Sequence, residues 1–163
     1  MSRHGGSGGT PAVRALTAAR IPFAERAYDH DPAAPSYGLE AAEALGVDPA
    51  RVFKTLVVDT GAGLAVGIVP VATTLDLKHL AAALGVKRVR MADVKDAERV
   101  TGYVAGGISP LGQRSTLPTV LDTSATGHAT ILVSGGRRGF DVELSPNDLL
   151  ALTKGVVASI SAV

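Results

Sequence analysis

Residues 52–69 have the sequence VFKTLVVDTGAGLAVGIV, in which two apolar runs, Val52 to Asp59 and Leu64 to Val69, flank Gly61-Ala62-Gly63. β-Branched residues favour strands, and a short glycine-rich connection joins antiparallel neighbours. The stretch therefore predicts a β-hairpin, and the remaining elements must pack around it.

Helices are predicted by capping residues before an apolar pattern, or by glycines after one. The predicted helices follow Thr10-Pro11 up to Ile21-Pro22, cover about Gly38–Leu45, run from Asp76 to Leu84 and from about Asp93 to Thr101, and follow Ser145-Pro146. Further strands are predicted at Val86–Met91, Thr119–Asp122, Ala129–Ser134, Phe140–Leu144 and Val156–Ile160. Because these elements interleave irregularly, we predict an α/β fold of the α+β type, with a mixed, largely antiparallel sheet curving into a partial barrel with helices outside.

The chain has 163 residues, the size of one domain. We expect a flexible Gly/Ser-rich lead at residues 1–9 and a single domain over residues 10–163. No segment has the apolar length of a signal-peptide core or a membrane span, so the sequence favours a cytoplasmic protein with no membrane partner.

Composition excludes several classes of site. A net charge of +1 excludes a strongly electrostatic, sequence-independent nucleic-acid binder, and the absence of cysteine excludes a thiolate nucleophile. Four scattered histidines form no ligand pattern, so neither a metal nor another cofactor is expected. A Ser/His/Asp hydrolase is disfavoured because no Gly-x-Ser-x-Gly elbow is present.

A second informative stretch is Gly106-Gly107-Ile108-Ser109-Pro110-Leu111-Gly112-Gln113, the glycine loop. Adjacent glycines lower stability, so a fold that keeps them usually needs unusual dihedral angles or a close approach to backbone N–H groups. The loop is either a tight turn or a place where a ligand meets bare backbone.

Lys54 begins a strand among apolar neighbours, an unusual position for a solvated cation. It is either a snorkelling side chain at a strand end or a point charge that meets a phosphate or ribose oxygen at a pocket mouth. Thr55 points to the opposite face of an ideal strand, so a shared site would need a twist or bulge.

Ser134 and Asp141 flank the turn Gly135-Gly136-Arg137-Arg138-Gly139. Two hairpin strands could bring them to one end of the sheet, although without further context a capping serine and a surface aspartate are the ordinary interpretation. Basic residues usually serve solubility, and the chain has them at Lys87, Arg88, Arg90, Arg114, Arg137 and Arg138. If the glycine segments form a pocket, Arg114, Arg137 and Arg138 are near it in sequence and could follow an RNA backbone.

Together, Lys54-Thr55-Leu56, the glycine loop and the segment from Ser134 to Asp141 resemble the YbaK/EbsC family of aminoacyl-tRNA deacylases, relatives of the editing domain of bacterial prolyl-tRNA synthetases. The similarity runs from about Thr10 to the C-terminus. Further matching segments are Thr10-Pro11-Ala12-Val13, Ile21-Pro22-Phe23, Tyr28-Asp29-His30-Asp31-Pro32, Val69-Pro70-Val71, Leu75-Asp76-Leu77-Lys78, Met91-Ala92-Asp93 and Thr101-Gly102-Tyr103.

The resemblance implies the same partial-barrel fold and a pocket for the aminoacyl end of tRNA. It implies that Lys54, Gly106 and Asp141 are catalytic. It further implies that Tyr28, Tyr37, Thr55, Gly107 and Ser134 bind the substrate. Relatives often carry phenylalanine where this chain has Tyr37, which adds a hydroxyl group.

Within the family the pattern is closest to the Cys-tRNA(Pro) deacylases, which implies release of cysteine from mischarged Cys-tRNA(Pro) and also from Cys-tRNA(Cys). In the chemistry proposed for them, the substrate's own thiol attacks its carbonyl to give a cyclic thiolactone. The ester that joins the amino acid to the tRNA is already activated. The enzyme therefore needs only to orient it and to stabilise the oxyanion with backbone N–H groups.

Two alternatives stay open: a sibling deacylase for alanine or another small amino acid, and a non-catalytic module that binds tRNA or a synthetase. The expected partners are the 3′ aminoacyl end of mischarged tRNA and, transiently, prolyl-tRNA synthetase. The protein itself is expected to be a monomer.

Overall fold

The computed structural model describes residues 9–31, 33 and 37–163, with only the backbone of Tyr37 included. Of the predicted lead, residues 1–8 lie outside this range. The helices are α1 (Pro11–Ala18), α2 (Tyr37–Leu45), α3 (Leu77–Leu84), α4 (Val94–Thr101) and α5 (Pro146–Thr153), with 3-10 helices η2 (Pro49–Arg51) and η3 (Thr123–Gly127). The strands are β1 (Ala24–Ala27), β2 (Phe53–Asp59), β3 (Leu64–Pro70), β4 (Thr74–Leu75), β5 (Arg90–Met91), β6 (Thr119–Asp122), β7 (Ile131–Arg137), β8 (Phe140–Leu144), β9 (Val156–Ala158) and β10 (Ser161–Ala162).

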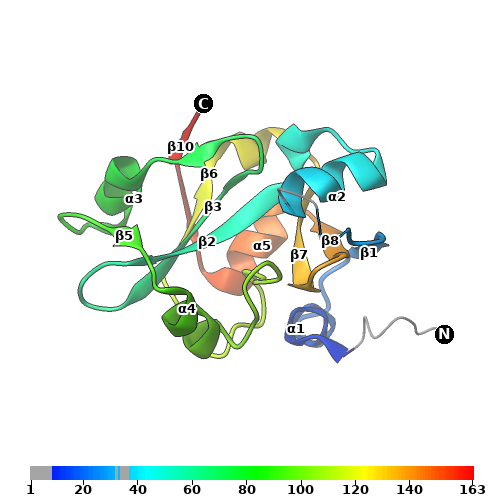
Figure 1. Cartoon of the computed structure of the whole chain (residues 1–163), viewed down its shortest axis with the longest axis horizontal. Helices are drawn as coiled ribbons and strands as arrows, with labels where there is room; N and C mark the ends of the chain where they lie inside the picture. The colour runs from blue at the N-terminus through cyan, green and yellow to red at the C-terminus, as the bar shows by residue number, and fades with distance from the viewer. Residues whose placement is uncertain (1–8, 32, 34–36) are drawn as a thin grey trace.

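The hairpin predicted from residues 52–69 is confirmed. β2 and β3 pair antiparallel without interruption, from Phe53 opposite Pro70 to Asp59 opposite Leu64. β3 also pairs in parallel with β6, and β6 with β9, which completes a five-stranded mixed sheet in the order β5-β2-β3-β6-β9. The hairpin thus lies near the centre of the molecule (Figure 1).

A second sheet, in the order β1-β8-β7, is antiparallel throughout, and β10 pairs with β4 apart from both. One parallel bridge, from Val52 just before β2 to Leu132 of β7, joins this part of the chain to the second sheet. The predicted fold class, a mixed and incompletely closed arrangement with surrounding helices, is confirmed, but its strands are divided among three sheets.

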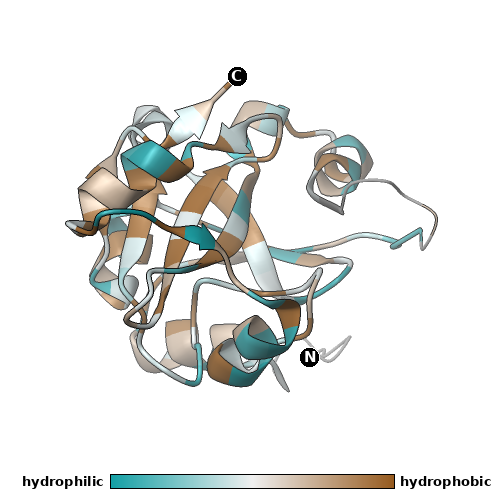
Figure 2. Ribbon diagram, turned by 60° about the vertical axis from the view of Figure 1, so that its left-hand side comes forward, coloured by the Kyte–Doolittle hydropathy of each residue, from teal (hydrophilic) through white to brown (hydrophobic). Residues whose placement is uncertain are grey.

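The core fills the space between the sheets and their helices. Fully buried Leu16, Ile68, Leu121 and Leu149 bring α1, β3, β6 and α5 into one apolar cluster. Figure 2 shows the central strands as mostly hydrophobic, whereas hydrophilic residues lie on the outer helices. None of the helices in the described part of the chain combines the length and apolar character that a membrane span requires.

The predicted helix starts are confirmed where side chains cap them. The side chains of Thr10, Asp76 and Ser145 accept hydrogen bonds from the backbone N–H groups of Val13, His79 and Asp148. These bonds satisfy N–H groups that have no partner within the helix. Asp76 and Ser145 directly follow β4 and β8, so these two strands end where the capped helices begin.

Two predicted strands are wrong in extent. The strand predicted at Val86–Met91 is reduced to β5, because Gly85 is left-handed and Val86 N–H donates to Ala81 C=O, which continues the end of α3. The strand predicted at Val156–Ile160 is shortened to β9, and β10 begins only after its predicted end. Asp122 Oδ1 accepts from the N–H groups of Ile160 and Ser161, so the chain leaves the five-stranded sheet there and pairs with β4 instead.

One edge of β2 is open in its middle. The chain is bridged to β7 at Val52, just before β2, and β2 pairs with β5 only at Val58 and Asp59. Val52 C=O accepts from Val71 N–H on the β3 side, whereas Val57 C=O accepts from Ala92 N–H on the β5 side. Since backbone groups alternate along an antiparallel strand, the N–H and C=O of Thr55 face the open edge.

Candidate active site

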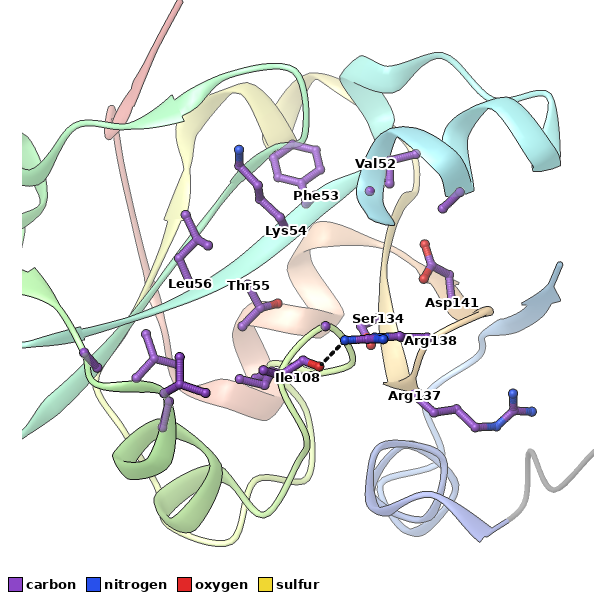
Figure 3. A pocket seen from close by; sticks show the side chains of 18 of the residues that line it. Val52, Phe53, Lys54, Thr55, Leu56, Ile108, Ser134, Arg137, Arg138 and Asp141 are labelled. Atoms are coloured by element: carbon purple, nitrogen blue, oxygen red, sulfur yellow. Dashed lines mark hydrogen bonds between the residues drawn. The ribbon is translucent and has the colours of Figure 1, made fainter. Parts of the chain in front are cut away.

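A pocket of about 340 Å³ opens along this free edge of β2. The second sheet, α2, α4 and the glycine loop close its other sides (Figure 3). Its lining residues are Tyr28, Gly38, Ala41, Val52 to Val57, Met91, Ala92, Val94, Ala97, Ala105, Gly106, Ile108, Ser134, Arg137, Arg138 and Asp141. Six of the eight site residues predicted from the sequence lie in this set.

Lys54 and Thr55 both line the pocket, although their side chains point to opposite faces of β2 (Figure 3). No bulge lies between them, because the pairing of β2 with β3 is regular. A pocket at the edge of a strand is lined by side chains of both faces. The open edge of β2 therefore explains why Lys54 and Thr55 share the pocket without a bulge.

Lys54 is a partly buried cation without a carboxylate partner among the described residues. Loss of hydration alone lowers the pKa of its ammonium group, and no neighbouring charge offsets that cost. A cation that is kept in this position is suited to an anionic or oxygen-rich ligand.

Thr55 carries a buried hydroxyl oxygen with no hydrogen-bond partner among the described residues. A buried polar atom without a partner costs free energy unless a ligand or water supplies one. With its backbone groups at the open strand edge, Thr55 offers a donor and acceptors to whatever fills the pocket.

Ser134 and Asp141 are direct cross-strand partners in the β7–β8 hairpin, as the flanking positions predicted. Asp141 is only 7% exposed, and burial raises the pKa of its carboxyl group to about 7. Arg26, its neighbour on β1, lowers that pKa, but desolvation outweighs it. A carboxyl group that is kept where burial disfavours its ionised form is characteristic of a functional site.

Tyr28 lines the pocket beside Asp141, and burial together with the charge of Asp141 raises the pKa of Tyr28 to about 12. Its phenol therefore stays neutral at physiological pH and can donate a hydrogen bond. Tyr37 begins α2, but its side chain lies outside the described part of the structure.

The two glycines at the start of the glycine loop differ in position. Gly106 lines the pocket in a left-handed conformation, with φ of +90°. Gly107 is buried beside the pocket, and a Cβ atom there would lie 2.7 Å from Cα of Arg137. Its N–H donates to Val104 C=O, and Gly107 is not among the residues that line the pocket, so its predicted substrate contact stays a prediction.

Other candidates from the sequence lie elsewhere. Ser109 is fully buried in the glycine loop, and His79 is exposed on α3, paired with Asp76 at 2.8 Å. Among residues 9–31, 33 and 37–163, no cluster of acidic or histidine side chains could hold a metal ion. Lys87 and Arg88 border a separate hollow beside α3.

The apolar wall of the pocket was missed by sequence reasoning. This wall is formed by four lining residues from β5, α4 and the glycine loop: Met91, Val94, Ala97 and Ile108. The helical spacing of Val94 and Ala97 is the one sequence signal that groups any of them. Together with the polar groups, this wall suits a small, partly apolar group attached to a charged or hydroxyl-rich carrier.

Comparison with known proteins identifies this architecture. The model of the aminoacyl-tRNA editing domain matches residues 31–152. A protein of Enterococcus faecalis, EbsC, provisionally named a Cys-tRNA(Pro)/Cys-tRNA(Cys) deacylase, is 40% identical over 93% of both chains.

Solved structures agree with this match. A structure provisionally described as a trans-editing enzyme for prolyl tRNA synthetase has a TM-score of 0.82 and 26% identity, over 99% of this chain and 100% of that one. The structure of a hypothetical protein has a TM-score of 0.83 and 25% identity, over 93% of this chain and 99% of the other. The chain therefore belongs to the aminoacyl-tRNA editing domain family and, within it, to the YbaK/EbsC deacylases.

Proposed function

We propose that this protein is a trans-editing deacylase that releases cysteine from Cys-tRNA(Pro) and Cys-tRNA(Cys). The observation that carries the proposal is the convergence of Lys54, Gly106 and Asp141 on one pocket, in a chain 40% identical to EbsC. Incubation with Cys-tRNA(Pro), with loss of the ester bond followed over time, tests the proposal. Persistence of the ester at enzyme excess would refute it.

Five groups of the pocket have a stated role in this proposal. The ammonium of Lys54 holds a phosphate or ribose oxygen of the terminal adenosine at the pocket. The carboxylate of Asp141 binds the α-ammonium of the aminoacyl group, with Ser134 and Tyr28 beside it. The Gly106 N–H stabilises the negative charge that develops on the ester carbonyl oxygen.

The nucleophile in this proposal is the thiol of the bound cysteine. Its sulfur forms a bond to its own carbonyl carbon, and the ester bond to the ribose oxygen breaks. The thiol proton ends on that ribose oxygen, so the products are a cyclic thiolactone and uncharged tRNA. The protein itself has no cysteine to act as nucleophile, and positioning with charge stabilisation is sufficient for such an activated ester.

This mechanism predicts a strong dependence on the substrate side chain. Ser-tRNA(Pro) should be deacylated at least about 100-fold more slowly than Cys-tRNA(Pro), because a hydroxyl group near neutral pH is a far weaker nucleophile than a thiol. Single-turnover rates at saturating enzyme measure the difference. Equal rates for the two esters would instead indicate attack by water.

We propose prolyl-tRNA synthetase as a transient partner, and a monomer in the cytoplasm, where tRNA is charged. A net charge of +1 allows few phosphate contacts, so the isolated protein should deacylate Cys-tRNA(Pro) and Cys-tRNA(Cys) at similar rates. Preference for the proline tRNA should appear when the synthetase is added, since it raises the local substrate concentration. A strong preference in the isolated protein would contradict this proposal.

A further inference from the structure

The backbone of Ala105, next to Gly106, is held from both sides by charged side chains. Its N–H donates to Glu98 Oε2 at 2.7 Å, and its C=O accepts from Arg138 Nη2 at 3.2 Å (Figure 3). Hydrogen bonds to charged partners are stronger than those between neutral groups. Ala105 is therefore fixed more firmly than the backbone of an ordinary loop.

The bond from Arg138 also fixes the neighbouring N–H group. Ala105 C=O and Gly106 N–H belong to one peptide unit, which is trans, so they point in opposite directions. Gly106 N–H has no hydrogen-bond partner among the described residues, and Gly106 lines the pocket. By holding the carbonyl, the guanidinium sets the direction in which this unused donor points.

The two side chains that hold Ala105 come from different elements, and Arg138 is exposed. Glu98 lies on α4 next to buried Ala97, and Arg138 lies in the β7–β8 turn. Gly107 rests on the backbone of that turn, since a Cβ atom there would approach Arg137 Cα to 2.7 Å. The glycine loop and the turn thus form one unit, in which Arg138 reaches across to Ala105.

We propose that Arg138 and Glu98 are positioning residues, which hold the Ala105–Gly106 peptide so that the Gly106 N–H meets the carbonyl oxygen of the bound ester. This inference rests on the proposed function, because the oxyanion belongs to ester cleavage. A preorganised donor acts in the transition state more than in the bound ground state. Loss of either residue should therefore lower kcat and change KM little.

The test measures deacylation of Cys-tRNA(Pro) by Arg138→Ala, Glu98→Ala and Glu98→Gln, with Arg99→Ala as control. Arg99 is an exposed arginine on the same helix as Glu98. We expect kcat to fall at least about tenfold in the two alanine variants, with KM within about twofold. Glu98→Gln should lose less than Glu98→Ala, because a glutamine carbonyl still accepts from Ala105 N–H without the charge, and Arg99→Ala should stay near the wild type.

Two further measurements separate positioning from other roles. Added guanidinium ion should partly restore kcat to Arg138→Ala, and the Gly106 amide resonance should shift in the substrate-free Arg138→Ala protein but not in Arg99→Ala. An increase in KM at unchanged kcat would place Arg138 on the RNA, and unchanged kcat with an unmoved Gly106 resonance would also overturn the inference. If the wild type cleaves no ester, the proposed function fails, and the Gly106 resonance alone decides whether Arg138 fixes this peptide.

Discussion

Lys54→Met is expected to lower kcat/KM for Cys-tRNA(Pro) by about 100-fold or more while the protein stays folded. Methionine keeps most of the apolar stem of lysine but removes the charge. Truncating one partner of a desolvated charge contact costs about 2–5 kcal/mol, or about 30- to several-thousand-fold in binding of the affected state. Because no carboxylate of the described residues pairs with Lys54, its loss leaves no buried charge behind in the free protein.

The control for this prediction is Lys95→Ala, an exposed lysine on α4. It should retain wild-type kcat/KM, and circular dichroism should show the same fold for both variants. Lys54→Arg should also be impaired, because a planar guanidinium does not replace a compact ammonium in a confined site. A folded Lys54→Met protein with ordinary activity would remove Lys54 from the mechanism.

Asp141→Asn is expected to lose at least about tenfold in kcat/KM and yet to be more stable than the wild type above neutral pH. The activity falls because an amide does not pair with the α-ammonium of the substrate. The stability rises because the variant no longer buries a carboxylate that resists ionisation. Such opposite changes are typical of residues that are kept for function at the expense of stability.

The sign of the stability effect follows from the pKa of Asp141, which burial raises from its ordinary 3.8 to about 7. Between these values the folded protein binds a proton that the unfolded chain has released, so wild-type stability falls as pH rises from about 4 to 7. Asparagine does not titrate. The advantage of Asp141→Asn in free energy of unfolding should therefore grow by about 2–3 kcal/mol, as an upper bound, between pH 5 and pH 8.

Urea unfolding at the two pH values measures this change, with Glu25→Gln as the matched control. Glu25 is exposed on β1, in the same sheet as Asp141, and should show no comparable pH-dependent gain. An Asp141→Asn variant that is equally destabilised at pH 5 and pH 8 would contradict the buried, poorly ionising carboxylate described above.

The parts of the fold that could be predicted from sequence are those with strong local signals. The β2–β3 hairpin combines β-branched runs with a glycine turn, and the helix starts carry capping side chains. β1 was missed because Ala24–Ala27 is a short, largely exposed edge strand with no apolar alternation. The division between β9 and β10 depends on Asp122, which lies more than 30 residues earlier in the chain.

The candidate site, too, could be predicted from the sequence only where the signal is local. Cross-strand placement of Ser134 and Asp141 followed from the turn between them, because a hairpin sets its own register. The joint use of Lys54 and Thr55 did not follow from strand alternation, because it depends on the open edge between β7 and β5. The close packing of Gly107 could not be predicted, because a sequence does not show that the β7–β8 turn lies against it.

The most direct test of the proposed function compares Cys-tRNA(Pro) and Ala-tRNA(Pro) with the same preparation of the protein. Both esters share the tRNA and the α-ammonium, so they differ in the thiol that the proposed mechanism requires. Loss of each labelled amino acid under single-turnover conditions gives the two rates. We predict rapid release of cysteine, with alanine released at least about 100-fold more slowly. Release of alanine at an equal or greater rate would contradict a cysteine-specific deacylase and assign the chain to the editing of small amino acids by water.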